Sequence, residues 1–522
     1  MLKTVDPTEF SNLLHLRSQI LVSNGAQLVA KGAREFALTR PLLSLLQSES
    51  TQLEELLDAY GARANQTWHL FRMHVAVLKN FSAAGYELLH LSHTFHSYDF
   101  RGTHPDFDTA TQGAITFVSA ILFCSLKQLV EDTYAFGWPP PEEMLSYDFS
   151  EELPEGMLPK NRVLPGKVTA QQLVTRLATS FLNNTEDARF LETASKCTGP
   201  DWRGLNFDLV SEANIRGMEE KFHTLQSLYD TYVSQSEIEG NDTSLRSLRG
   251  HISLVLHLLK VLTVFLHFYE RHVRLQGGEL FCHKNCVLKS DWYLEIVTRY
   301  LCKYSYEFLT SARDLCQHML QRYAVIDTIE VAAPPYFGFH VRPATLIASI
   351  VRHYGSRVTM QLDREYDAGV PMNLFLANEW LNQLKRQHVG RALASYSNVI
   401  RHIQSQMDSN VLTPVEGIHE LLRSMADKGL IQILAYPLAV ANIIKTSPSK
   451  TLTELLQAVI AHLLAQRQIN IIYPVKVKFS GDVRVLDDIR ILAENGYGEN
   501  ERGANVPLPP ELLYLSHARP AK

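Results

Sequence analysis

The chain has 522 residues, of which 46% are hydrophobic and 20% charged, and its formal net charge at neutral pH is −5. This is an ordinary globular composition with enough apolar residues for buried cores, and the length is that of about three domains. The weakly acidic balance argues against a general nucleic-acid binder, because such proteins carry a basic stripe.

The six cysteines are scattered along the chain, and the first residues, MLKTVDPTEFSNLL, lack the basic-then-apolar pattern of a signal peptide. We therefore expect a cytoplasmic protein with reduced thiols. Two apolar runs, 113–126 and 253–269, need a membrane check. The first is too short to span a bilayer, and the second carries two histidines and a lysine. Both are predicted to be buried helices, with no membrane insertion.

Residues 1–323 are predicted to form a large helical bundle. Apolar residues recur there at three- and four-residue spacing, as in LLHLRSQILVSNGAQLVAKGAREF. The prolines of segment 136–167 exclude a regular helix, so this segment is predicted to be a long surface connection.

The pattern changes near residue 325. A β-branched run, VIDTIEVA, is followed by a helical pattern that ends at Gly355 and by an alternating strand, SRVTMQL. Helical patterns return over 386–470, and strand and helix patterns reappear over 471–500. We expect the segments 324–385 and 471–500 to complete one small sheet around a helical insertion, because an isolated strand pair is rarely stable. Residues 501–522 are expected to form a C-terminal tail.

Local signals mark several helix ends in this second region. Thr413 with Glu416, and Thr451 with Glu454, have the spacing of capping boxes. Asp482 is predicted to cap the last helix, which Gly496 ends.

The segment GFHVRPAT, residues 338–345, carries the most chemistry. Pro343 suits the first turn of a helix, which places His340 just before the helix start. The free N–H groups and the dipole of a helix start favour an anion there, and Arg342 adds a donor fork matched to phosphate oxygens. Gly338 lets the loop turn sharply. A neutral imidazole is a competent nucleophile near pH 7, so the pattern suits a histidine that accepts a phosphoryl group.

This segment resembles the active-site motif of the histidine-containing phosphocarrier protein, HPr, of the bacterial phosphotransferase system. The family pattern is Gly-Leu-His-Ala-Arg-Pro-Ala, and Phe339 and Val341 depart from it mildly. The predicted elements around the motif also follow the family order, with VPMNLFLANEWL similar to its short second helix. The matching residues are Gly338, His340, Arg342, Pro343 and Ala344.

With the predicted helical bundle, the chain is expected to be a mainly α protein with an α+β C-terminal domain. The resemblance implies that this domain is an open-faced β-sandwich in which helices cover one face of a four-stranded sheet. It implies that His340 takes a phosphoryl group from an Enzyme I-like donor and passes it to an acceptor protein of unknown identity. Val341, Arg342 and Ala344 would bind the phosphate, and Gly338 and Pro343 would shape the motif. Such a protein is a phosphocarrier rather than a turnover enzyme, and it needs no cofactor.

Two departures weaken parts of the resemblance. Asn373 stands where many family members have a regulatory serine, so control by phosphorylation at that position is not expected. The insertion of about 85 residues falls in a loop that lies near the active histidine in the family, so it could cover His340. This favours a specialised regulator with few partners.

Two alternatives remain open at this point. The HPr-like part could be a docking scaffold without phosphotransfer, which predicts a buried His340. An enzyme could instead lie in the helical region, with a polar pocket around His93 and His96, although no metal motif is present and we expect no metal site. The cysteines Cys282, Cys286, Cys302 and Cys316 are predicted to be buried free thiols rather than metal ligands.

Overall fold

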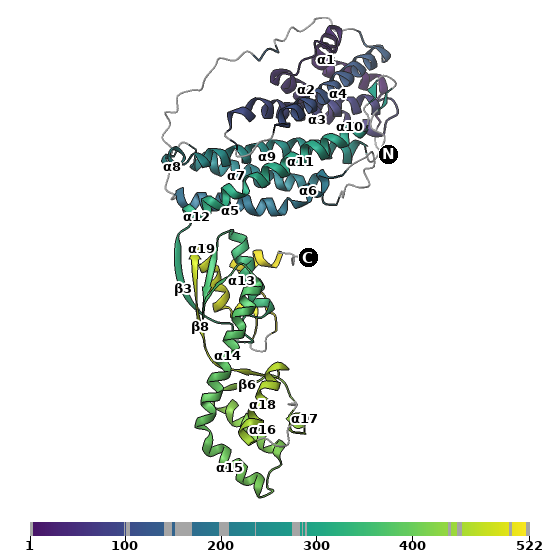
Figure 1. Cartoon of the computed structure of the whole chain (residues 1–522). Coiled ribbons are helices and arrows are strands. Elements are labelled where there is room, and N and C mark those ends of the chain that lie inside the picture. The colour runs from purple at the N-terminus through teal and green to yellow at the C-terminus, as the bar shows by residue number, and fades with distance from the viewer. Residues whose placement is uncertain are drawn as a thin grey trace. The chain divides into compact units, whose positions relative to one another are not determined.

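The computed structural model describes residues 4–98, 100, 105–139, 149–151, 170–197, 208–234, 236–273, 282–283, 286–287, 290–436, 440–445, 451–500 and 504–517. Two compact units, Met1–Met319 and Leu320–Lys522, account for the internal contacts. Of the residues that the structure describes, 74% are helical, and one four-stranded antiparallel sheet is present, which confirms a mainly α protein with some β structure (Figure 1). Most of the expected connection 136–167 lies outside the described residues.

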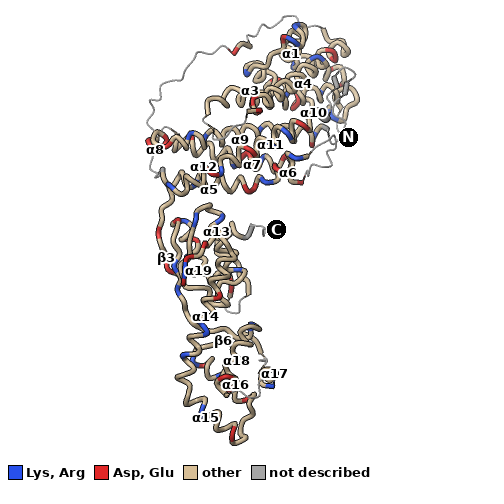
Figure 2. The backbone as a smooth tube through the Cα atoms, viewed as in Figure 1, with Lys and Arg blue, Asp and Glu red and all other residues tan. Residues whose placement is uncertain are grey.

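In its described ranges the first unit has helices and one short strand pair, β1 (Cys282–His283) with β2 (Cys286–Val287). Both basic and acidic residues are scattered along these helices (Figure 2). Their bounds are α1 Pro7–Lys31, α2 Arg40–Ala59, α3 His69–Thr94, α4 Phe107–Ala135, α5 Ala170–Asp187, α6 Arg189–Ser195, α7 Glu212–Tyr232, α8 Glu237–Asn241, α9 Thr243–Phe268, α10 Ser290–Glu295, α11 Lys303–Ser311 and α12 Arg313–Tyr323.

Two helical segments of this unit are long and apolar enough to cross a membrane by length and composition, Phe107–Ala135 and Thr243–His272. The run 113–126 is therefore part of a longer helix than the sequence indicated, because α4 extends through flanking polar residues. Inside the unit, 83% of the apolar window in Thr243–His272 and 56% of that in α4 are buried. The α9 helix packs on α3 and α7, as the core helix of a bundle does.

The second unit contains the four-stranded sheet, in the order β3–β8–β4–β5 with every pair antiparallel. Its strands are β3 Ile326–Ala332, β4 Val358–Gln361, β5 Glu365–Asp367 and β8 Lys476–Asp482. The late strand β8 lies between the early strands β3 and β4. This pairing confirms that the two α/β segments complete one sheet.

Helices cover one face of this sheet. Strand residues on that face are therefore buried, and the residues that alternate with them are exposed. Val331, Met360 and Phe479 belong to the buried face and share one core with three helices. These are α13 Val341–Tyr354, α14 Pro371–Ser395 and α19 Val483–Glu494. As predicted, Gly355 ends α13 in a left-handed conformation, and Asp482 caps α19.

The insertion has a separate hydrophobic core. Its helices are α15 Ser397–Asp408, α16 Pro414–Asp427, α17 Val440–Lys445 and α18 Leu452–Ala465. Both predicted capping boxes are present, at α16 and α18. An antiparallel strand pair, β6 Ile431–Ile433 with β7 Ile469–Ile471, corrects the expectation of an all-helical insertion. The α14 helix is 25 residues long and extends past residue 385 into the insertion, so the second helix is not short.

The chain beyond α19 belongs to the sheet-bearing core. Gly496–Gly498 and Pro510–His517 are short 3₁₀ segments, and Leu512 and Leu515 are buried among the residues of the sheet. We call residues 326–385 and 471–517 the sheet part, and residues 386–470 the insertion.

Candidate functional site

His340 is the N-cap residue of α13, with extended backbone angles, as its sequence position before Pro343 predicts. Its carbonyl oxygen accepts the first helical hydrogen bond, from the N–H of Ala344 at 3.1 Å. The preceding residues, Phe337 and Gly338, both have positive φ angles. The sharp turn of this loop therefore places the imidazole at the start of the helix.

Asn378 on α14 holds this loop in place. Its side-chain Oδ1 accepts a hydrogen bond from the N–H of Phe339 at 3.0 Å, and its Nδ2 donates to the carbonyl of Phe337 at 2.9 Å. A Cβ atom on Gly338 would lie 1.9 Å from Asn378 Oδ1. Glycine is thus required at 338 by both the backbone angle and the close approach of α14.

The imidazole of His340 is paired with a carboxyl group. Its Nε2 lies 3.1 Å from Oε2 of Glu499, and the side chains are 18% and 3% exposed, respectively. Glu499 follows the turn after α19, so the pair joins the first and last segments of the sheet part. Because Nε2 has this partner, Nδ1 is the ring nitrogen left to face a reactant.

Arg342 holds the segment that carries Glu499. Its Nε donates to the carbonyl of Gly498 at 2.9 Å, and its Nη2 donates to the carbonyl of Val506 at 3.0 Å. The structure therefore places the guanidinium on backbone carbonyls next to the histidine–carboxyl pair, where it positions Glu499.

Burial shifts both members of the pair toward their neutral forms. It lowers the pKa of His340, and the positive charge of Arg467 lowers it further. Burial raises the pKa of Glu499 to about 7, against the opposing charges of Arg342 and Arg467. The lowered pKa favours the uncharged ring of His340 at neutral pH, and the raised pKa of Glu499 brings its titration close to neutral pH.

His340 also lines a cavity of about 310 Å³ where the sheet part meets the insertion. The insertion thus lies beside the histidine, as its sequence position suggested. The two parts contribute different walls, with α14 and the histidine loop on one side and the end of α18 on the other. The polar lining residues are His340, Asn378, Glu379, Asn382, Lys385, Arg386, Arg467 and Asn470.

The remaining residues expected to bind phosphate have different surroundings. Val341 is 68% exposed at the first helical position, where its N–H has no acceptor within the helix. Ala344 is buried, and its N–H is used by the His340 carbonyl. Amides earlier in the turn are therefore better placed for an anion than that of Ala344.

Sequence reasoning missed three residues at this site: Glu499, Lys385 and Arg467. Glu499 has no local signal, because it reaches His340 only through the fold. Lys385 did leave a signal, since it interrupts an otherwise apolar series at every fourth residue of α14, from Ala377 to Leu393.

The structure does not bring His93 and His96 together: His93 lines a cavity with Ser92 and Gln112, and His96 is not among its lining residues. Nε2 of His96 pairs with Oδ2 of Asp108 at 2.9 Å, on exposed side chains. In the described ranges, no group of three or more His, Cys, Asp or Glu residues could hold a metal ion. Cys302 and Cys316 are free and buried, as predicted, and burial raises the pKa of both thiols. The side chains of Cys282 and Cys286 lie outside the described residues.

Searches of family models, curated proteins and solved structures return no match to this chain. A function for the protein must therefore be argued from the motif and from the geometry around it.

Proposed function

We propose that this chain is an HPr-like phosphocarrier or regulatory protein, which accepts a phosphoryl group on His340 from an Enzyme I-like donor and passes it to a protein partner. The observation that carries the proposal is the pairing of His340, at the start of α13, with Glu499. This arrangement combines a nucleophile, a group that orients it, and a site for the transferred charge.

Glu499 would select the reactive form of the histidine. When its carboxyl is ionised, Oε2 accepts a hydrogen bond from Nε2–H, so the lone pair of the neutral ring resides on Nδ1. Nδ1 then attacks the phosphorus as the bond from phosphorus to the donor nitrogen breaks. The carboxylate stabilises the positive charge that develops on the ring.

The transferred phosphoryl group would lie at the start of α13. Amides of the first helical turn have no intrahelical partner, and the helix dipole favours negative charge there. Val341 and Arg342 supply the first of these amides. The guanidinium of Arg342 lies close by and would add positive charge. Its hydrogen bond to the carbonyl of Gly498 also holds the next residue, Glu499, in position.

The fold gives the proposal independent support. The sheet part has the element order strand, helix, two strands, helix, then strand and helix after the insertion, with helices over one face of the sheet. That order agrees with the one the HPr resemblance implies. The insertion beside His340 narrows access to the ring, which favours few partners over the many that a small, open carrier meets.

A docking role without phosphotransfer is the second candidate. It is favoured by the low exposure of His340, at 18%, and by the proximity of the insertion. In that case the pairing with Glu499 would only stabilise the fold, and the motif would present a surface to a partner.

Phosphorylation of the purified chain separates the two candidates. The protein is mixed with phosphoenolpyruvate and the Enzyme I of its host, and its intact mass is measured beside His340→Ala. The exposed His402 on α15 provides a matched control, His402→Ala. We expect one acid-labile phosphate that is absent only from His340→Ala. No added mass, with ordinary HPr labelled in the same tube, would reject the phosphocarrier in favour of docking.

A further inference from the structure

The cavity beside His340 contains a buried lysine without a charged partner. Lys385 is 5% exposed, and its Nζ has one hydrogen bond, at the long distance of 3.5 Å, to the carbonyl of Pro335. That carbonyl also accepts a shorter bond, 3.0 Å, from the amide of Asn470. Among the residues that the structure describes, no ion pair involves Lys385.

A buried ammonium group in this state is costly, because burial favours its neutral form. Burial alone lowers the pKa of Lys385 to about 8, with no carboxylate to oppose the effect. A nonpolar residue would satisfy the same apolar series of α14 at no such cost. The lysine is explained if an anion enters the cavity and completes its hydrogen bonds.

Arg467 gives a second, independent indication from the opposite wall. It follows α18 with a φ of +55°, and the hydrogen bonds from Arg467 N to Leu464 O and from Gln468 N to Leu463 O form a Schellman motif. Glycine is the usual residue at this position, because side chains disfavour the left-handed conformation. An arginine at this position therefore holds the backbone in a conformation that is unfavourable for it.

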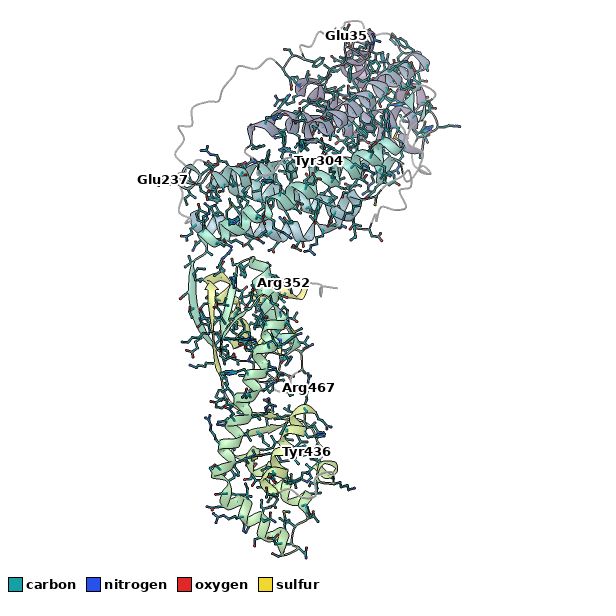
Figure 3. All side chains as sticks on the ribbon, viewed as in Figure 1. Glu35, Glu237, Tyr304, Arg352, Tyr436 and Arg467 are labelled. Carbon is teal, nitrogen blue, oxygen red and sulfur yellow. The ribbon has the colours of Figure 1, made fainter. Side chains whose placement is uncertain are left out.

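The guanidinium of Arg467 lies over the ring of Phe337, with its carbon 5.2 Å from the ring centroid. It therefore reaches from the insertion to the loop that carries His340. Figure 3 labels Arg467 between the sheet and the helices of the insertion. Arg386 is a third cation on the lining, and Glu379 at the exposed rim is the one carboxylate among the lining residues that the structure describes.

From this lining we infer that the cavity binds a small organic phosphate, with the phosphate on Lys385 and Arg467. Arginine and lysine donors match phosphate oxygens, and the amide of Asn382 offers a partner for a hydroxyl group. Ala461, Leu464 and Ile471 supply an apolar wall. The volume of about 310 Å³ lies at the lower end of the range for small-molecule sites, which suits a small phosphate ester.

Such a ligand would lie next to His340, so the accessibility of the histidine would depend on the concentration of the ligand. The inference goes beyond the proposed phosphocarrier role and does not depend on it, because binding is measured on the unphosphorylated chain.

Methyl NMR of the full chain tests the site with glycerol 3-phosphate as the probe. Signals of Leu464 and Ile471 report on the cavity itself, so they distinguish this site from anion binding elsewhere. We expect saturable shifts with glycerol 3-phosphate, weaker shifts with inorganic phosphate, and none with glycerol. Lys385→Met is expected to weaken binding by about tenfold or more, because it removes a charge-assisted hydrogen bond.

Arg467→Gly should weaken binding similarly while leaving the melting temperature unchanged or higher, since glycine suits the backbone there. Two controls match these changes. Lys478→Met removes an exposed charge from β8, and Asn410→Gly places glycine at an equivalent left-handed position after α15. Both should bind like the parent chain. Unshifted Leu464 and Ile471 signals with either phosphate, shifts with glycerol, or parental affinity in folded Arg467→Gly would overturn the inference.

Discussion

The environments of individual side chains decide which chemistry His340 can perform. Its Nε2 lies against Glu499, a carboxyl whose pKa burial raises to about 7. If Glu499 is protonated, its O–H donates to Nε2 and the ring proton resides on Nδ1, which removes the nucleophile. If Glu499 is ionised, Nε2 carries the proton and Nδ1 is reactive. In the proposed phosphocarrier, the carboxyl would therefore act as a proton-dependent switch on the histidine.

The rate of His340 phosphorylation is therefore expected to rise with pH through about 7 and then level off. His340 contributes little to this step, because its pKa is lowered and its ring is already neutral there. Glu499→Gln should reduce the rate by roughly 10² or more and remove the pH step, since an amide favours the wrong tautomer. Initial rates of phosphoprotein formation between pH 5.5 and 8.5 measure both effects.

The exposed Glu494, at the end of α19, is the control for that substitution. Glu494→Gln should keep both the rate and the pH dependence. An unchanged pH profile in Glu499→Gln would contradict the assigned role of the carboxyl.

The α14 helix is the main secondary-structure element that joins the site to the insertion. Its first half supplies Asn378, which fixes the histidine loop, and its second half enters the core of the insertion through Val389 and Leu393. Lys385 lies between these halves on the buried stripe. One rigid helix therefore carries both the loop support and the buried cation.

The buried Lys385 should make stability depend on pH in a defined direction. Its pKa of about 8 in the folded chain lies below the unfolded value, so the unfolded state binds more protons between these values. The free energy of unfolding is therefore expected to rise between about pH 8 and 10.5, by up to about 3 kcal/mol from this group. In Lys385→Met this contribution should vanish, and the variant should be the more stable protein at pH 7.

The free energies of urea unfolding of the parent and of Lys385→Met are measured at pH 7 and pH 10. The difference between the two proteins at each pH isolates the contribution of Lys385, because the other titrating groups contribute equally to both. Lys478→Met, which removes an exposed lysine, should show no such difference. A variant less stable than the parent at pH 7 would show that the ammonium has a favourable partner in the folded chain.

At the scale of the whole molecule, the second unit contains two cores in one interrupted chain. Strand β8 pairs with both β3 and β4, although it follows the insertion in sequence. The core of the insertion is made from residues between Val389 and Ile471. The sheet part therefore needs strand β8, which follows the insertion, in order to fold, whereas the core of the insertion does not.

This difference predicts the behaviour of two fragments. Residues 320–522 should fold and protect the amides of β3 and β4 from hydrogen exchange. Residues 320–472 lack β8, so β3 loses its partner and the sheet amides should exchange freely, while amides of α16 and α18 stay protected. Sheet protection in the shorter fragment would show that β8 is dispensable.

The sequence alone determined the features that depend on short-range interactions. The capping boxes at Thr413 and Thr451, the end of α13 at Gly355 and the N-cap position of His340 all follow from residues a few positions apart, which interact directly in a helical turn. Two alternating runs predicted strands β4 and β8, because side-chain burial in a strand has a period of two, and the β-branched run VIDTIEVA predicted β3.

Tertiary structure alone decided what surrounds the histidine. Glu499 lies 159 residues from His340 in sequence, and Arg467 comes from a separate core, so no local pattern links them to the motif. The strand pair β6–β7 and the length of α14 also depend on partners distant in the chain. Local sequence placed His340 at a helix start, and packing of distant segments gave it its carboxyl partner, its partial burial and its neighbouring cavity.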